Sequence, residues 1–163
     1  MTDLNIQIRP LNINENRFLI DMSYQAIFIP DGEPPPSKDI VDTPQLEKYF
    51  KEWGRTGDHC LVAEYEGEKI GAIWCRLFDA SNKSFGYVSD DIPELSIAVD
   101  KPYRNKGVGT MLIEAFYTHL NENGFHVLSL SVDRCNPAVN LYLRTGFNII
   151  RTNVNDYLML KQL

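Results

Sequence analysis

The chain has 163 residues and a mass of 18.7 kDa, a size that suits one domain with one buried core. Hydrophobic residues make up 44% and charged residues 23%, which excludes a disordered or fibrous protein. The net charge of −6 argues against a general binder of nucleic acid or anionic membranes, because such proteins need a broad basic surface. We therefore expect one domain over residues 1–163 whose partner is a small molecule or peptide amine, with neither nucleic acid nor a membrane as partner.

The sequence shows no targeting or metal-binding pattern. The segment Met1–Pro10 lacks the basic and then apolar run of a secretory signal, so we expect a cytoplasmic protein. Cys60, Cys75 and Cys135 form no CxxC pair and have no zinc-site spacing, so we interpret them as reduced thiols and expect no metal. His59 adjoins Cys60, but neighbouring residues of a strand point to opposite faces.

The N-terminal third predicts one strand and two helices. Alternating apolar residues predict a strand over 6–9, and helical spacing predicts a helix that starts near Asn14 or Asn16 and stops at Ile29. The proline-rich segment 30–36 cannot form regular structure and is expected to be a surface loop, either over a site or simply between helices. A second helix is expected over 44–53, with Pro44 at its first position.

The remaining two thirds predict mostly strands with two interleaved helices. Strands are expected at 60–65, 69–78, 94–99, 127–132, 147–151 and 157–160, and helices from near 107 to 124 and from about 137 to 145. The first two of these strands form a hairpin around the turn 66–68, and 79–93 is expected to be irregular. This order predicts a mixed α/β layer with helices on both sides of one sheet.

One segment has the pattern of an anion site. A strand ending at Val99 is followed by Arg104-Asn-Lys-Gly-Val-Gly109 and then by an amphipathic helix. The glycines allow a turn with inward N–H groups, and the helix start adds free N–H groups and its positive dipole end. Lys101, Arg104 and Lys106 add positive charge, which suits a diphosphate ligand. The alternative is an ordinary glycine-containing turn before a surface helix; Walker and dinucleotide fingerprints are absent.

This segment and a second one resemble a known family. Arg104–Gly109 matches the R/Q-x-x-G-x-G/A motif of the GNAT superfamily of N-acetyltransferases, and Asn136-Pro-Ala-Val-Asn-Leu-Tyr142 with Gly146-Phe147 resembles its N-x-A-x-x-L-Y-x-x-x-G-F segment. The resemblance is clear from Cys60 onward and only topological before it. Asn105 departs from the pattern, because the family often has glycine or another small residue there.

The resemblance implies a fold and a cosubstrate. The implied fold is α/β of the α+β type: a mixed, mostly antiparallel sheet with two splayed parallel central strands and helices on both faces. The implied cosubstrate is acetyl-coenzyme A, with its pantetheine arm on the backbone of the strand 94–99, its pyrophosphate in the glycine loop and a further contact after the next strand. The implied binding residues are Ile97, Ala98, Val99, Arg104, Asn105, Lys106, Gly107, Val108, Gly109, Thr110 and Asn136.

Acetyl transfer needs a neutral amine, although an alkyl amine has a pKa of about 10.4, so some group must accept a proton. Glu94, at the mouth of the splayed strand, is our candidate base, directly or through water; the alternative is a solvated carboxylate, with Asp90, Asp91 and Glu64 as rivals. The resemblance implies that Tyr142 is the acid that protonates the coenzyme thiolate. The alternative for Tyr142 is a buried tyrosine on a core-facing helix.

The sequence therefore predicts a cytoplasmic N-acetyltransferase in which the amine attacks the thioester directly in a ternary complex. Cys135 has no paired histidine and is expected to be a small buried residue, not a nucleophile. Two alternatives stay open: a non-catalytic acyl-coenzyme A sensor with the same fold, and a nucleotide-binding regulator with equal affinity for ADP and coenzyme A. The acceptor amine is not identified, and the resemblance makes a homodimer possible.

Overall fold

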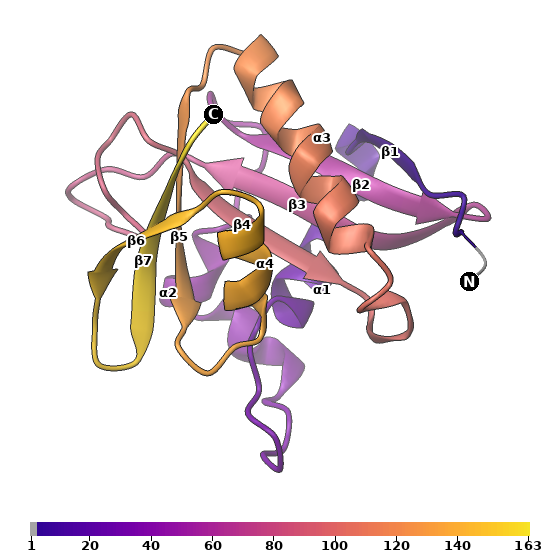
Figure 1. Ribbon diagram of the computed structural model, residues 1–163, viewed down its shortest axis with the longest axis horizontal. Helices are drawn as coiled ribbons and strands as arrows, with labels where there is room; N and C mark the ends of the chain where they lie inside the picture. The colour runs from indigo at the N-terminus through magenta and orange to yellow at the C-terminus, as the bar shows by residue number, and fades with distance from the viewer. Residues whose placement is uncertain (1–2) are drawn as a thin grey trace.

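A computed structural model describes residues 3–163, and a seven-stranded sheet forms its centre (Figure 1). The strands are β1 Gln7–Pro10, β2 His59–Tyr65, β3 Glu68–Arg76, β4 Glu94–Val99, β5 Val127–Asp133, β6 Asn148–Thr152 and β7 Asp156–Gln162. Their order is β1-β2-β3-β4-β5-β7-β6, and every neighbouring pair is antiparallel except β4 and β5. The predicted mixed sheet with a parallel central pair is confirmed.

Helices cover both faces of this sheet, as predicted. The α-helices are α1 Asn16–Gln25, α2 Pro44–Glu47, α3 Val108–Glu122 and α4 Ala138–Arg144, and the 3-10 helices are η1 Ile13–Glu15, η2 Lys38–Asp42 and η3 Lys101–Tyr103. Helices α3 and α4 lie on the front face in Figure 1, while α1 and α2 lie behind it. Within residues 3–163, no helix has the length and apolar character needed to cross a membrane.

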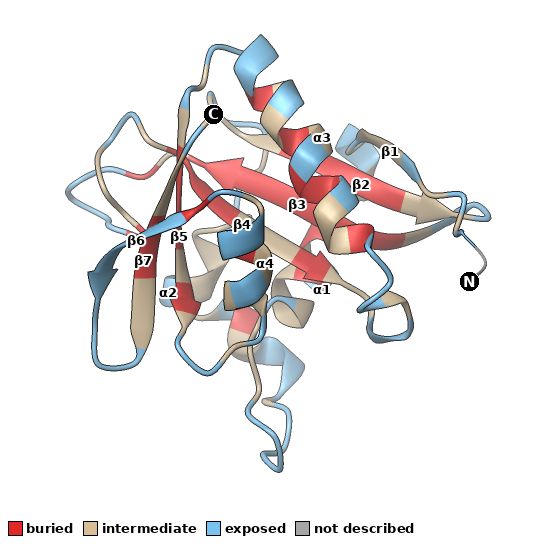
Figure 2. Cartoon of the chain, viewed as in Figure 1, coloured by how far each residue is buried: buried red, intermediate tan, exposed pale blue. Residues whose placement is uncertain are grey.

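A hydrophobic cluster flanks the sheet on each face. The larger one lies under α3 and α4 and includes the fully buried Phe116. The smaller one packs Leu19 and Met22 of α1 against Val62 and Trp74 of β2 and β3. Burying one leucine, methionine, valine or phenylalanine side chain stabilises the fold by roughly 1.5–3 kcal/mol. Figure 2 shows the buried residues concentrated on the central strands and on the inward side of α3.

The strand β4 presents alternate residues to the two clusters. Leu95 and Ile97 belong with the larger cluster, and Ala98 belongs with the smaller one. The predicted β2–β3 hairpin is also present, with Glu66 and Gly67 at φ values of 50° and 81°. Two positive φ values in succession are typical of a type I′ turn, whose twist matches that of the strands.

The prediction of a helix over 44–53 is wrong beyond Glu47. From 48 to 52 the chain forms turns, and Glu52 has a left-handed φ of 53°. The reason is tertiary: the guanidinium of Arg76 donates to the carbonyl oxygens of Lys48 at 2.9 Å and Lys51 at 2.7 Å. These oxygens therefore serve a buried charge instead of continuing a helical ladder. The first helix is also shorter than predicted and ends at Gln25.

Candidate active site

The parallel strands β4 and β5 touch at one end and then separate (Figure 1). Glu94 of β4 lies opposite Ser129 of β5, and the Ser129 N–H donates to the carbonyl of Pro93 at 3.0 Å. Beyond this point the β4 backbone edge no longer pairs with β5, so its polar groups are available to a ligand, apart from the Val99 carbonyl, which accepts from Arg104. Ile97, Ala98 and Val99 occupy this diverging part of the strand.

The glycine loop leads directly into α3. Gly107 has a φ of 84°, and the first helical bond runs from the Met111 N–H to the Gly107 carbonyl at 3.0 Å. The N–H groups of the first turn have no partner inside the helix. Asn105 also has a left-handed φ, of 59°, which asparagine tolerates better than most residues. This explains how Asn105 replaces a small residue in the motif.

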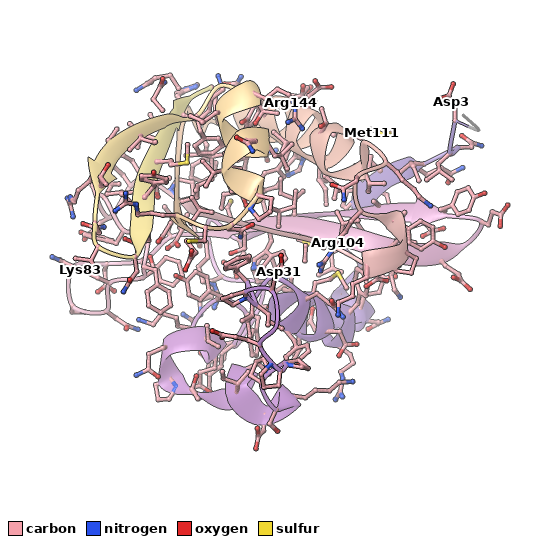
Figure 3. All side chains as sticks on the ribbon, turned by 60° about the horizontal axis from the view of Figure 1, so that its bottom comes forward. Asp3, Asp31, Lys83, Arg104, Met111 and Arg144 are labelled. Atoms are coloured by element: carbon pink, nitrogen blue, oxygen red, sulfur yellow. The ribbon has the colours of Figure 1, made fainter. Side chains whose placement is uncertain are left out.

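The basic side chains of the loop have different surroundings. Arg104 is exposed, and its Nε donates to the Val99 carbonyl at 2.7 Å, which fixes the loop to the end of β4. Lys106 places its Nζ 5.9 Å from the centre of the Tyr103 ring, and Lys101 is exposed on η3. Figure 3 labels Arg104 close to the start of α3. Positive charge thus gathers around a helix N-terminus, an arrangement that suits a phosphate group.

The two motifs are in contact in space. Asn136 accepts the Ala138 N–H at 2.9 Å through its side-chain oxygen, which closes a turn directly before α4. A Cβ on Gly109, in the first turn of α3, would lie 3.2 Å from Leu141 Cδ2 of α4. Glycine at this position lets the start of α3 lie against α4. Val108 is buried, and its side chain belongs to the larger hydrophobic cluster.

Tyr142 lies on the inner side of α4 and is 9% exposed. Its ring packs edge to face against Phe147, with centroids 5.8 Å apart. Burial, and to a lesser extent Tyr117, raises the pKa of the Tyr142 phenol, so it stays protonated at neutral pH. The structure thus agrees with the alternative of a buried tyrosine, and it leaves the hydroxyl in the protonated form that an acid requires.

Glu94 is 4% exposed, which excludes a solvated strand-end carboxylate. The hydroxyl of Tyr49 donates to its two oxygens at 3.0 and 3.2 Å, and the Gly86 N–H donates to Oε1 at 3.0 Å. Burial raises the pKa of Glu94 to about 7, although Ser84, Tyr49, Gly86 and the charge of Lys48 oppose the rise. A carboxyl group with this pKa exchanges protons near neutral pH.

The rival carboxylates have other partners. Glu64 pairs with Arg9 at 2.9 Å on β2, which is separated from β4 by β3. Asp90 accepts from the Tyr87 hydroxyl and Asp91 accepts from the Ser89 hydroxyl, both within an exposed loop. Glu94, in contrast to these three carboxylates, lies at the point where β4 and β5 begin to separate.

Three residues of this region were missed at the sequence level. Tyr49 lies in the segment 44–53, for which the sequence predicts only a helix, yet it is a hydrogen-bond partner of Glu94. Arg76 and Asp58 form a buried ion pair at 2.7 Å, with side chains 2% and 1% exposed. A signal for Arg76 was present, because it is a lone charge in the apolar run from Ile70 to Phe78. Nothing local in the sequence connects Tyr49 to Glu94, 45 residues away.

The cysteines are free thiols, as predicted, but Cys135 is exposed, so the expectation that it is buried is wrong. It lies in the connection after β5, outside the core clusters. Burial raises the pKa of Cys60 and Cys75, which makes them poor nucleophiles. His59 lies 3.0 Å from His119 of α3, while Cys60 belongs to the cluster under α1, so the two side chains do point to opposite faces.

A surface cavity of about 380 Å³ lies beside Cys135, and another of about 420 Å³ lies next to the β2–β3 turn. The first is lined by Asp133, Arg134, Cys135, Val154, Asn155 and Tyr157. It therefore adjoins the Asn136 segment.

Comparison with known proteins agrees with this geometry. The model of the acetyltransferase (GNAT) family matches residues 24–147. The chain belongs to this family. N-alpha-acetyltransferase 50 of Danio rerio is 26% identical over 113 residues, which are 68% of this chain and 64% of that protein. Mycothiol acetyltransferase of Propionibacterium freudenreichii is 32% identical over 96 residues, 58% of this chain and 29% of that protein. The chain thus matches less than two thirds of either relative.

Solved structures show the same fold. The PaiA N-acetyltransferase of Thermoplasma acidophilum, in complex with coenzyme A, has a TM-score of 0.72 at 21% identity, over 98% of this chain and 100% of that one. An acetyltransferase structure from Acinetobacter baylyi has a TM-score of 0.73 at 18% identity, over 99% of this chain and 95% of that one. The GNAT fold expected from the motifs is confirmed.

Proposed function

We propose that this GNAT protein is an N-acetyltransferase that moves an acetyl group from acetyl-coenzyme A to a primary amine, by direct attack in a ternary complex. The observation that carries the proposal is the meeting of the two motifs. The start of α3, with its glycine loop, lies against α4 through Gly109 and Leu141. Both adjoin the place where β4 and β5 separate.

The coenzyme fits this region from its phosphates to its thioester. A Cβ added at Gly107 would meet no atom within 4 Å, so the space in front of the first turn of α3 is open to a pyrophosphate. The proposed phosphate contacts are Arg104, Asn105, Lys106, Gly107, Val108, Gly109 and Thr110. The pantetheine amides would bond to the free edge of β4 at Ile97, Ala98 and Val99, and Asn136 would contact the coenzyme beside α4.

Two proton transfers complete the reaction. Glu94 accepts a proton from the attacking amine, through a water molecule because the carboxylate is buried. The amine nitrogen bonds to the thioester carbon, the carbon–sulfur bond breaks, and the sulfur leaves with the bonding electrons. Tyr142 then gives its proton to this sulfur; the raised pKa of its phenol means that the proton is present before the transfer. The products are an acetamide and free coenzyme A.

The acceptor is proposed to be a primary amine that is cationic in solution, on a small molecule or a peptide. The names of the relatives, mycothiol acetyltransferase and N-alpha-acetyltransferase 50, indicate that related proteins act on both kinds. Asp31 and Glu33, on the exposed loop between α1 and η2, would attract such a cation to the face that carries Glu94.

The test combines binding with turnover. Calorimetry with acetyl-coenzyme A is expected to give one site per chain and much weaker binding of ADP. A panel of polyamines, amino acids, aminoglycosides and peptides with free N-termini is then assayed for thiol release. Release with at least one amine, together with a mass increase of one acetyl group on it, supports the proposal. Equal affinity for ADP and coenzyme A would contradict it and favour a nucleotide-binding regulator.

The burial of Glu94 beneath Tyr49 favours one alternative, a non-catalytic sensor of acyl-coenzyme A with the same fold. Such a protein would bind the coenzyme and release no thiol with any amine. The panel therefore separates the two functions, and sedimentation with and without coenzyme tests the possible homodimer.

A further inference from the structure

The hydroxyl of Tyr49 connects three segments of the chain. It donates to the two carboxylate oxygens of Glu94 and accepts the Phe85 N–H at 3.0 Å. Its ring packs against Phe78 and Phe85, with centroids 5.1 and 6.3 Å away. Burial and the charge of Glu94 raise the pKa of Tyr49, so the hydroxyl remains a donor across the physiological range. The contact is thus an ordered, charge-assisted hydrogen bond.

Tyr49 is held in an irregular segment by a buried charge. Arg76 donates to the carbonyl oxygens of Lys48 and Lys51, on either side of Tyr49, and its two other nitrogens reach Asp58 at 2.9 and 2.7 Å. The Trp53 ring lies 5.3 Å from the guanidinium. The turn that carries Tyr49 is therefore fixed to the same sheet that carries Glu94.

The charged and titratable side chains around Glu94 differ in whether they contact its carboxylate. Arg76 lies opposite Glu94 in the β3–β4 register, but its guanidinium is directed to Asp58. The Nζ of Lys48 donates to Asn82 and to the Lys83 carbonyl and makes no hydrogen bond to Glu94. Its positive charge still lowers the pKa of Glu94 from a distance. Of these titratable side chains, Tyr49 donates directly to the carboxylate.

The neutral groups around Glu94 complete the site. Ser129 of β5 donates to the Gly86 carbonyl and not to Glu94. Ser84 lies close to the carboxylate, and its buried hydroxyl has no hydrogen bond of regular geometry within the described chain. The Gly86 N–H is the backbone donor to Glu94.

We propose that Tyr49 is a positioning residue for Glu94, whose hydroxyl orients the carboxylate and sets the pH range in which it accepts a proton from the amine. This inference rests on the proposed function, because it gives Glu94 the role of base. Tyr49 opposes the effect of burial by stabilising the charged carboxylate. Removing the hydroxyl while keeping the ring should therefore favour the protonated, inactive form of Glu94.

The decisive variant is Tyr49→Phe. In protein labelled with ¹³C at the glutamate carboxyl carbons, the Glu94 signal is assigned by its loss in Glu94→Gln and then titrated by NMR. We expect the midpoint to rise by about one pH unit. If it rises from about 7 to about 8, the ionised fraction at pH 7 falls about fivefold. With the best amine of the panel, kcat should fall by the same factor at pH 7 and recover at pH 9.

A control variant is Tyr65→Phe, which also removes one tyrosine hydroxyl. Tyr65 lies at the turn of the β2–β3 hairpin, whereas Glu94 lies opposite Arg76 at the other end of this hairpin. The titration of Glu94 and the pH profile of kcat in this variant should match those of the parent protein.

A purely structural role for Tyr49 predicts a different result, because a loosened site admits water and lowers the midpoint of the Glu94 titration. A lowered or unchanged midpoint in Tyr49→Phe, or an equal loss of kcat at every pH, overturns the proposal. If Glu94→Gln keeps full activity, the base assignment itself fails and Tyr49 loses its role with it. If Glu94→Gln is inactive and Tyr49→Phe titrates like the parent, only the Tyr49 proposal fails.

Discussion

The two faces of the sheet are stabilised in different ways. Under α3 and α4, the core is a large apolar cluster to which regular helices contribute residues such as Leu112, Phe116 and Tyr142. Under α1 and the segment 38–52, the apolar cluster is smaller, and buried polar groups lie beside it: the Arg76–Asp58 pair and Glu94. One face thus presents a helix start on an apolar support, and the other holds charged side chains of β3 and β4 through partners on irregular segments.

This difference indicates how the two substrates would be accommodated. A phosphate cradle made from backbone N–H groups needs only a helix start and glycine, so its support can be entirely apolar. A base that titrates near neutral pH needs a carboxylate that is removed from water and still hydrogen-bonded. The second requirement introduces buried charge, which a protein stabilises only by pairing it.

The largest effect is expected on the α3 and α4 face, at Tyr142. If this tyrosine is the acid, Tyr142→Phe should lower kcat by roughly 10²- to 10⁴-fold and leave coenzyme affinity almost unchanged. The control is Tyr117→Phe, a half-buried tyrosine of the same face, whose hydroxyl donates to the Thr145 carbonyl. It should cost about 1 kcal/mol of stability and little activity. Equal kcat in Tyr142→Phe and the parent protein would leave Tyr142 as a core residue.

A large loss of stability is expected on the other face, at Asp58. Asp58→Ala leaves the guanidinium of Arg76 buried without its charge partner, which typically costs about 3–5 kcal/mol. Urea unfolding measures this loss. The matched control is Glu52→Ala, which removes the exposed partner of Arg55 and should cost no more than about 1 kcal/mol. Similar losses in both variants would show that the buried pair does not support this face.

These two predictions concern residues that the sequence revealed to different degrees. Tyr142 and the glycine loop lie in local patterns, in which spacing along the chain determines the helix start and the inward side of the helix. Asp58 and Tyr49 act on residues 18 and 45 positions away, and only the folded sheet brings them together. For the same reason the strands and α3 were predicted nearly to their ends, whereas the helix over 44–53 was not.

The candidate site was also predictable only where it depends on local sequence. The sequence placed Glu94 and the glycine loop at opposite ends of one strand segment, which follows from chain order. The burial of Glu94 could not be predicted, because its cover comes from Tyr49 and from the irregular loop at Gly86. The exposure of Cys135 was missed for a related reason, since the connection after β5 has no periodic pattern that reports burial.

The pH dependence of stability provides a third test, specific to the polar face. The folded-state pKa of Glu94, about 7, exceeds its ordinary value of 4.5, so between these values the folded protein keeps a proton that the unfolded chain has lost. Stability should therefore fall as pH rises through this window. Glu94→Gln removes the penalty and should gain up to about 3 kcal/mol over the parent between pH 4 and pH 8.

The control for this test is Glu15, whose pKa is shifted in the opposite direction to that of Glu94. Hydrogen bonds from Arg9 lower the pKa of Glu15 to about 2, so its stabilising contribution is present above pH 4.5 and is lost as pH falls toward 2. Glu15→Gln should thus be less stable than the parent at pH 7 and approach it in acid. Parallel stability curves for Glu94→Gln and the parent would mean that Glu94 does not titrate in this range.

The smallest effect separates coenzyme binding from backbone strain, by means of two glycines that bracket α3. Gly107 and Gly124 have the same φ of 84°, and a Cβ at either one would meet no atom within 4 Å. Alanine at either position should cost about 1 kcal/mol of stability, because side chains disfavour the left-handed region. Only Gly107→Ala places its methyl group where the pyrophosphate is proposed to bind, so only this variant should weaken acetyl-coenzyme A, by about tenfold in calorimetry. If the two variants bind coenzyme equally well, the phosphates do not lie at the start of α3, and the apolar face of the sheet supports a helix without supporting the cosubstrate.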